Sequence, residues 1–155
     1  MKILGKYPGL RLRRNRKYDW SRRLVAENNL TVSDLILPIF VTEGRNKVES
    51  IKSMPDIYRY SVDKISPVIN KASKLGIPLV AIFPHTANNK KDSVGSEALN
   101  EDNLVCQTIR KIKKNNPNIG VMADVALDPY TDHGHDGILI KKEILNDETI
   151  EILSK

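Results

Sequence analysis

Three short apolar runs divide the chain at intervals of about forty residues. They are Leu35–Val41, Leu79–Phe83 and Gly120–Leu127. Each run is continuously apolar rather than alternating, which is typical of parallel strands that are covered on both faces. We therefore expect three buried strands joined by connections long enough to hold helices.

A helical pattern follows the first apolar run. Apolar residues recur at helical spacing from Val62 to Leu75, and Gly76 supplies a stop signal. Ser66 is the candidate N-cap, with Pro67 at the first helical position, where a missing N–H group costs nothing.

Two further helices are expected. The first covers about Asp102–Asn115 and carries Cys106 among its apolar positions, so this thiol is interpreted as a small buried hydrophobe. The last begins at Asn146, a good N-cap that is followed by two acids.

The order of these elements is a run of βαβ units, which predicts a right-handed parallel sheet in an α/β fold. Order alone favours a doubly wound sheet and a (β/α)8 barrel equally. The connections Thr42–Tyr60 and Pro84–Glu101 are long and polar, and loops of this length are often functional. His85, at the end of the second strand, is either a solvent-exposed loop residue or part of the mouth of the sheet.

The formal charge of +6 is concentrated at the N-terminus. Met1–Arg23 contains nine basic residues and one acid, Asp19, which makes that segment +8 and the remainder −2. We expect a basic arm over residues 1–30 that docks on a neighbouring subunit. A nucleic-acid-binding tail, with Tyr7, Tyr18 and Trp20 for stacking, and a mitochondrial transit peptide rank lower.

Composition excludes several other classes. No apolar run approaches the ~20 residues of a membrane helix, so no membrane association is expected. A single cysteine rules out an internal disulfide and a cysteine-based zinc site, and it suits a reducing cytosol. Neither a phosphate-binding glycine loop nor a serine nucleophile elbow is present.

An acidic cluster follows the third apolar run, between Ala123 and Leu139. It contains four aspartates and two histidines: Asp124, Asp128, Asp132, Asp136, His133 and His135. A carboxylate inside an apolar strand is costly unless it is paired, so Asp124 is expected to face a cation at the mouth of the sheet. The alternative is an aspartate that accepts local backbone hydrogen bonds at the strand end.

The two histidines flank Gly134, and a His-x-His pair is a common metal-binding element. Gly134 and Gly137 also indicate a turning loop that needs positive φ. Two interpretations of His133 and His135 therefore stay open: they shape this loop, or they lie near a bound substrate.

Seven segments together resemble the delta-aminolevulinic acid dehydratase family, also called porphobilinogen synthases. Besides Ala123–Leu139, these are Arg11–Arg16, Asp34–Val41, Ser53–Ser61, Gly76–Pro84, Gly95–Val105 and Ile144–Thr149. The resemblance implies a lyase that condenses two 5-aminolevulinate molecules to porphobilinogen in haem biosynthesis. It also favours the barrel: residues 31–155 would form the first three βα units of a (β/α)8 TIM barrel, which typically needs ~250 residues when closed.

The resemblance also implies roles for individual residues. Asp124 would line the active site, with Asp128, His133, His135 and Asp136 as substrate or loop candidates. Zinc-dependent members carry cysteines where this chain has Ala126, Asp128 and Asp136, so no active-site zinc is expected. Magnesium, an allosteric ion in this family, would bind residues outside this chain.

The family's two Schiff-base lysines lie in its second half, and no position here matches them. The loop lysines Lys90, Lys91, Lys141 and Lys142 are not substitutes, because none lies in an apolar strand. The chain is therefore interpreted as an N-terminal half, inactive alone, from a cytoplasmic homo-octamer without nucleic-acid partners. A non-catalytic fragment and a basic-arm binding module built on this scaffold are the alternatives.

Overall fold

The computed structural model describes residues 5–10 and 14–155, and the chain forms two units, 1–31 and 32–155. Part of the expected Arg11–Arg16 motif, residues 11–13, lies outside the described residues. The first unit contains helix α1, Asp19–Leu24. Asp19 holds this helix through ion pairs at i+3 and i+4, to Arg22 at 3.4 Å and Arg23 at 3.0 Å.

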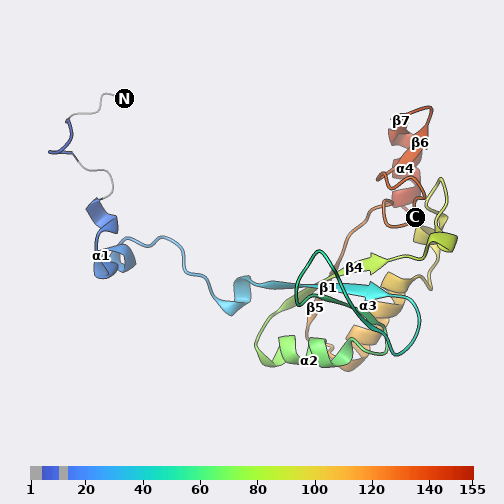
Figure 1. The fold of residues 1–155 in the computed structure, drawn as a ribbon, viewed down its shortest axis with the longest axis horizontal. Coiled ribbons are helices and arrows are strands. Elements are labelled where there is room, and N and C mark those ends of the chain that lie inside the picture. The colour runs from blue at the N-terminus through green and yellow to red at the C-terminus, as the bar shows by residue number, and fades with distance from the viewer. Residues whose placement is uncertain (1–4, 11–13) are drawn as a thin grey trace. The chain divides into compact units, whose positions relative to one another are not determined.

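The second unit is a five-stranded sheet with two helices, followed by a hairpin and a last helix (Figure 1). Its sheet has the order β2-β3-β1-β4-β5, in which β1 pairs in parallel with both β3 and β4, and β4 with β5. The elements are β1 Ile36–Thr42, β2 Val48–Ser50, β3 Tyr58–Ser61, α2 Ser66–Lys74, β4 Leu79–His85, α3 Leu104–Asn115, β5 Gly120–Ala123, β6 Ile138–Ile140, β7 Glu143–Leu145 and α4 Asn146–Leu153.

Helices α2 and α3 cover one face of the sheet (Figure 1). Alternate residues of β1 and β4 point into this layer and pack against apolar residues of the helices. The buried cluster comprises Ile39, Val41, Ile65, Ile69, Ala72, Val80, Ile82, Leu104, Ile112 and Ile119. The predicted α/β class with a parallel sheet is confirmed.

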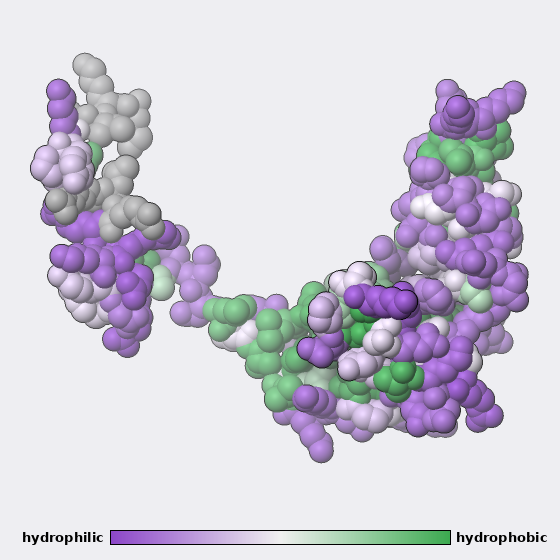
Figure 2. Space-filling model, viewed as in Figure 1, coloured by the Kyte–Doolittle hydropathy of each residue, from purple (hydrophilic) through white to green (hydrophobic). Residues whose placement is uncertain are grey.

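The opposite face of the sheet is exposed, contrary to the expectation that these strands are covered on both faces. Ile36, Phe83 and Met122 occupy the alternate positions of β1, β4 and β5, and they are 48%, 41% and 47% exposed. Figure 2 shows hydrophobic residues at the surface around the end of the sheet where β1 begins. Since parallel sheets are normally buried on both faces, this one requires a covering layer that residues 32–155 do not supply.

The expected elements are present, but several boundaries were wrong. The third strand ends at Ala123 rather than Leu127, so Asp124 follows the strand instead of lying inside it. Helix α2 begins one residue early, at Ser66, and its cap position is Ile65. Asn146 does not cap α4 but is its first residue. Gly76, at φ +80°, ends α2 as predicted.

Two structured segments were not anticipated. The connection between the first strand and α2 is not a plain loop, because it contains β2 and β3, which pair antiparallel with one another. Strands β6 and β7 form a hairpin before α4. Thr149 joins this hairpin to α4: its Oγ1 donates to the Leu145 carbonyl at 2.6 Å and accepts from the Ile138 N–H at 3.0 Å.

The tip of the β6–β7 hairpin provides a test of backbone strain. Lys141 and Lys142 are its two central residues, and both have positive φ, 49° and 71°. Such a turn favours Asn-Gly, because a side chain is strained in this region. Lys142→Gly is expected to raise the free energy of unfolding by roughly 1 kcal/mol, as measured by urea denaturation. Lys52→Gly, at an exposed position without positive φ, is the control and should not stabilise.

Candidate active site at the carboxyl ends of the strands

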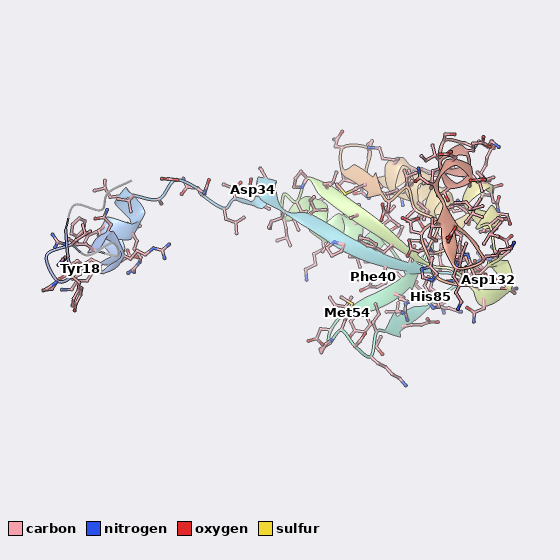
Figure 3. All side chains as sticks on the ribbon, turned by 90° about the horizontal axis from the view of Figure 1, so that it is seen from above. Tyr18, Asp34, Phe40, Met54, His85 and Asp132 are labelled. Atoms are coloured by element: carbon pink, nitrogen blue, oxygen red, sulfur yellow. The ribbon has the colours of Figure 1, made fainter. Side chains whose placement is uncertain are left out.

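The parallel pairing of β1, β4 and β5 places their carboxyl ends at one edge of the sheet. His85 is the last residue of β4 and is exposed, and Asp124 directly follows β5. Figure 3 shows His85 and Asp132, from the loop after β5, toward this same end. Ligands of open α/β sheets and of barrels bind at this edge, which makes it the candidate site.

A cavity of about 330 Å³ opens beside the end of β5. Asp124 and Asp128 provide two carboxylates, and Lys91 provides a cation in the same cavity. The complete lining is Ile82, Phe83, Pro84, Lys91, Val105, Asp124, Asp128, Pro129 and Tyr130. Asp124 is exposed and lines the cavity together with Lys91, and a cationic partner for Asp124 stays a prediction. The cavity therefore combines an apolar wall with groups suited to an amine or a carbonyl substrate.

The electrostatics of this cavity shift two titrating groups. Partial burial raises the pKa of the Asp128 carboxyl, and the negative charges of Asp136 and Asp124 raise this pKa further, while Lys91 lowers it. Burial raises the pKa of Tyr130 to about 12. Asp128 therefore holds a proton more readily than an ordinary aspartate, and the Tyr130 hydroxyl stays protonated at neutral pH.

Asp136 has a structural contact within the loop. Its Oδ1 accepts a hydrogen bond from the Leu127 N–H at 2.6 Å, which closes the turn after β5. Leu127 is completely buried, and Ala126 is 9% exposed. Asp136 thus holds the segment that carries Asp128, and its charge acts on the Asp128 carboxyl.

The donor set at Ala126, Asp128 and Asp136 does not fit a tetrahedral zinc site. Ala126 has no atom that could bind a metal, and one Asp136 oxygen already accepts a hydrogen bond from the Leu127 N–H. Zinc also prefers thiolate or imidazole ligands. Throughout the part of the chain that the structure describes, no group of three or more His, Cys, Asp or Glu side chains is arranged to hold a metal ion.

His133 and His135 make contacts that shape the loop. The His133 Nε2 lies 3.3 Å from the Ser93 carbonyl, and its Nδ1 accepts from the His135 N–H at 3.2 Å. The two rings are 5.6 Å apart, across a turn at Gly134 with φ +73°. These contacts favour the loop-shaping interpretation of His133, while a role beside a substrate stays a prediction.

Sequence reasoning missed the residues that join the strand-end loops. Lys90, in the loop after β4, lies 3.1 Å from Glu43 after β1 and 3.2 Å from Glu97. Asp92 forms a parallel bridge with Thr131, and its carboxylate accepts from the N–H groups of Val94 and Ser96 at 3.0 Å. An aspartate shortly before Gly95-Ser96 is a turn signal that could have identified Asp92.

The same loop ends at a well-formed helix cap. Asn103, which is buried, accepts from the Cys106 N–H at 2.9 Å and starts α3. Cys106 is only half-buried, so its interpretation as a buried hydrophobe was partly wrong.

Fold and site together define an α/β chain of the barrel class, with an acidic cavity at the carboxyl ends of its parallel strands. The family model described as delta-aminolevulinic acid dehydratase matches residues 9–155. The chain therefore belongs to the delta-aminolevulinic acid dehydratase family, as the sequence motifs indicated.

Individual relatives agree with this assignment. The chain is 54% identical over 144 residues to the delta-aminolevulinic acid dehydratase of Bradyrhizobium diazoefficiens, covering 93% of this chain and 41% of that protein. It is 43% identical over 142 residues to that of Chlamydia pneumoniae, covering 92% of this chain and 43% of the relative. The chain thus spans about two fifths of the length of these relatives.

A solved structure resembles the fold closely. The crystal structure of the Toxoplasma gondii delta-aminolevulinic acid dehydratase (porphobilinogen synthase), in complex with its reaction product porphobilinogen, matches with a TM-score of 0.85 and 36% identity. The match covers 93% of this chain and 41% of that chain. The α/β sheet described above therefore corresponds to the N-terminal part of a porphobilinogen synthase barrel.

The raised pKa of Asp128 predicts a pH-dependent effect on stability. Ionisation of this carboxyl disfavours the folded state, so the penalty is absent below the ordinary carboxyl pKa and grows as pH rises through the folded value. Asp128→Asn should therefore raise Tm at pH 7 and leave it unchanged near pH 3, when both side chains are neutral. Asp132→Asn, on an exposed position of the same loop, should change Tm little at either pH.

Proposed function

We propose that this chain contributes the N-terminal part of an active site that condenses two 5-aminolevulinate molecules to porphobilinogen. The match of the family model to residues 9–155 carries this proposal. The position of the acidic cavity supports it, since enzymes built on parallel barrels place their active sites at the carboxyl ends of the strands.

The cavity suits a substrate that carries an amino group. The carboxylates of Asp124 and Asp128 attract the ammonium form, and the Tyr130 hydroxyl and the Lys91 ammonium can donate to an oxygen atom. Partial burial and the charges of Asp136 and Asp124 raise the pKa of Asp128, which supports a role for this carboxyl in taking up and returning a proton during the reaction. In the proposal these residues orient the substrate and exchange protons, without forming covalent bonds to it.

The covalent steps fall to residues outside this chain. A Schiff base forms when a lysine amine attacks a ketone carbonyl and water leaves, which requires an amine with a lowered pKa in the pocket. The structure gives Lys90 the opposite environment, because ion pairs with Glu43 and Glu97 raise its pKa. Lys141 and Lys142 lie at the exposed hairpin tip.

The proposal assigns no zinc to the positions of Ala126, Asp128 and Asp136. Two carboxylates without a third ligand are hard donors, which suit magnesium or a monovalent cation better than zinc. A family magnesium site would use residues beyond this chain.

One free cysteine fits a reducing, cytosolic setting. No helix among the described residues is long and apolar enough to cross a membrane.

The activity proposal predicts that the chain needs complementation. Alone, it should form no porphobilinogen, and borohydride with 5-aminolevulinate should trap no adduct on it, since the covalent amines are absent. Mixing it with the remaining C-terminal part of the Bradyrhizobium diazoefficiens relative should give turnover, measured as porphobilinogen formation. Elemental analysis of the active mixture should find no stoichiometric zinc.

Substitutions in the acidic loop test whether Asp124 takes part in the reaction of the complemented enzyme. Asp124→Asn should lower kcat of the complemented enzyme by at least ~100-fold, the low end of the range for a lost proton-transfer group, while assembly is unaffected. Asp132→Asn is the matched control and should retain activity. A borohydride-trapped adduct on any lysine of the isolated chain would contradict the assignment of covalent catalysis to the other part.

The basic arm predicts a role in assembly. Its nine cations and exposed Tyr18 and Trp20 suit docking against another subunit. Deleting residues 1–23 should reduce the mass of the complemented oligomer, as measured by light scattering. An unchanged mass would argue against this role. A milder variant carries Arg14→Gln and Arg16→Gln together. It should weaken the same assembly, and this loss should be smaller at high salt, where charge interactions are already screened.

A further inference from the structure

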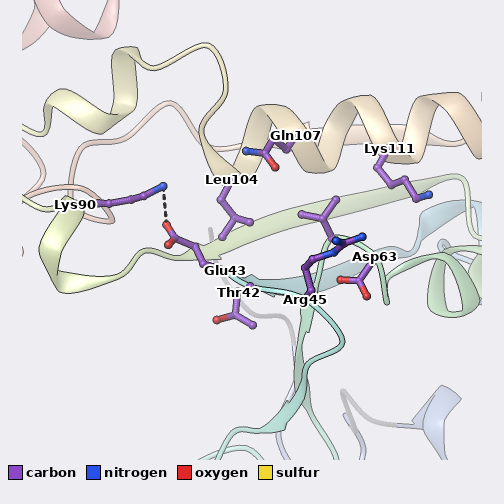
Figure 4. Close-up of a pocket in the computed structure, with 10 residues that line it drawn as sticks. Thr42, Glu43, Arg45, Asp63, Lys90, Leu104, Gln107 and Lys111 are labelled. Carbon is purple, nitrogen blue, oxygen red and sulfur yellow. Dashed lines mark ion pairs between the residues drawn. The ribbon is translucent and has the colours of Figure 1, made fainter.

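A second cavity, of about 490 Å³, lies between the loop after β1 and helix α3 (Figure 4). It shares no lining residue with the acidic cavity. Its walls are formed by the end of β1, the start of the segment before α2, Lys90 and one side of α3. The lining residues are Thr42, Glu43, Gly44, Arg45, Val62, Asp63, Lys90, Leu104, Gln107 and Lys111.

The two carboxylates of this cavity already have partners. Glu43 lies 3.1 Å from the Lys90 ammonium, as the dashed line in Figure 4 marks. Both oxygens of Asp63 accept from the Asn46 N–H, at 3.2 Å and 3.0 Å. A hydrogen bond from Ser61, together with the one from the Asn46 N–H, lowers the pKa of Asp63, so this carboxyl is ionised at neutral pH.

Two cations in the cavity have no such partner. Neither Arg45 nor Lys111 forms an ion pair with any residue that the structure describes. Figure 4 shows Arg45 directed from its loop toward α3, and Lys111 extending from α3 toward the same space. On this side of the cavity the two cations face one carboxylate, Asp63, which leaves a local sum of one positive charge.

The remaining wall of the cavity is suited to contact with the apolar part of a small organic molecule. Val62 and Leu104 give it an apolar surface, and the Gln107 amide adds a neutral donor and acceptor. A guanidinium binds the two oxygens of a carboxylate with a matching fork, and a nearby ammonium supplies a second charge. The cavity volume lies within the range of small-molecule sites.

We propose that the cavity lined by Arg45, Lys111, Val62 and Leu104 binds a short-chain organic monocarboxylate. The single local positive charge matches a monoanion, and the apolar wall favours an alkyl chain over an inorganic ion. The site is separate from the proposed catalytic cavity, and its occupancy does not depend on turnover.

The experiment is a titration of the isotope-labelled 155-residue chain with butyrate, followed through the backbone amide resonances of Thr42, Leu104 and Gln107. Saturable shifts are expected at these residues. Arg45→Gln and Lys111→Gln should each raise Kd by at least ~10-fold, the loss expected for one charge-assisted contact. Lys114→Gln, in the last turn of α3 and outside the cavity, is the matched control and should leave Kd unchanged.

Titrations with butyramide and with inorganic phosphate identify the ligand class, and the Asp124→Asn variant tests whether the site is independent of the acidic cavity. Butyramide, the neutral analogue of butyrate, should bind at least ~10-fold more weakly. Asp124→Asn should leave butyrate binding unchanged, so that this result is independent of the proposed catalytic function. Three outcomes would each overturn the proposal: tighter binding of inorganic phosphate than of butyrate, Kd values in the Arg45→Gln and Lys111→Gln variants that equal the Kd of the unaltered chain, or no saturable shift at the three amides.

Discussion

The parallel pairing of β1, β4 and β5 is the constraint on which the rest of the structure depends. Because the three strands run in one direction, the loop after each of them emerges at the same edge of the sheet. Segments that lie about forty residues apart in the sequence therefore become neighbours in space at this edge. Both cavities, the acidic loop and the ion-paired Lys90 result from this one arrangement.

The strand-end loops are further joined by polar contacts. Lys90 connects the loops after β1 and β4 through its ion pairs, and Asp92 connects the loop after β4 to the loop after β5 through its bridge with Thr131. Exposed ion pairs contribute little to stability. Their effect here is positional, since they fix the loops that hold Asp124, Asp128 and Tyr130 around one space.

The exposed apolar face of the sheet corresponds to the inner face of the barrel found in the family. Ile36, Phe83 and Met122 stand on the face that a closed barrel would turn inward. The chain corresponds to about two fifths of its relatives, which is consistent with a sheet whose inner face is still without opposing strands. Burial of this face is therefore the expected driving force for association with the rest of a barrel.

The sequence by itself determined the class of the protein. Continuous apolar runs predicted β1 and β4 nearly to the residue, periodicity predicted α2 and α3, and motifs identified the family. These signals are local, because apolar runs and helical periodicity lie within the residues of each element. The same patterns indicated Asp124 and Asp128 as site candidates, since acids that follow an apolar run stand out.

Only the tertiary structure decided what depends on contacts across the chain. Lys91 and Tyr130 join the acidic cavity, and Arg45 joins Lys111, through the folding of separate loops onto one edge. The hairpin at Lys141-Lys142 gave no sequence signal, because lysine is a poor residue for positive φ and the neighbouring strands impose the turn. Local pattern thus identified the strands and helices, while long-range packing decided which face of the sheet is buried and which polar residues meet.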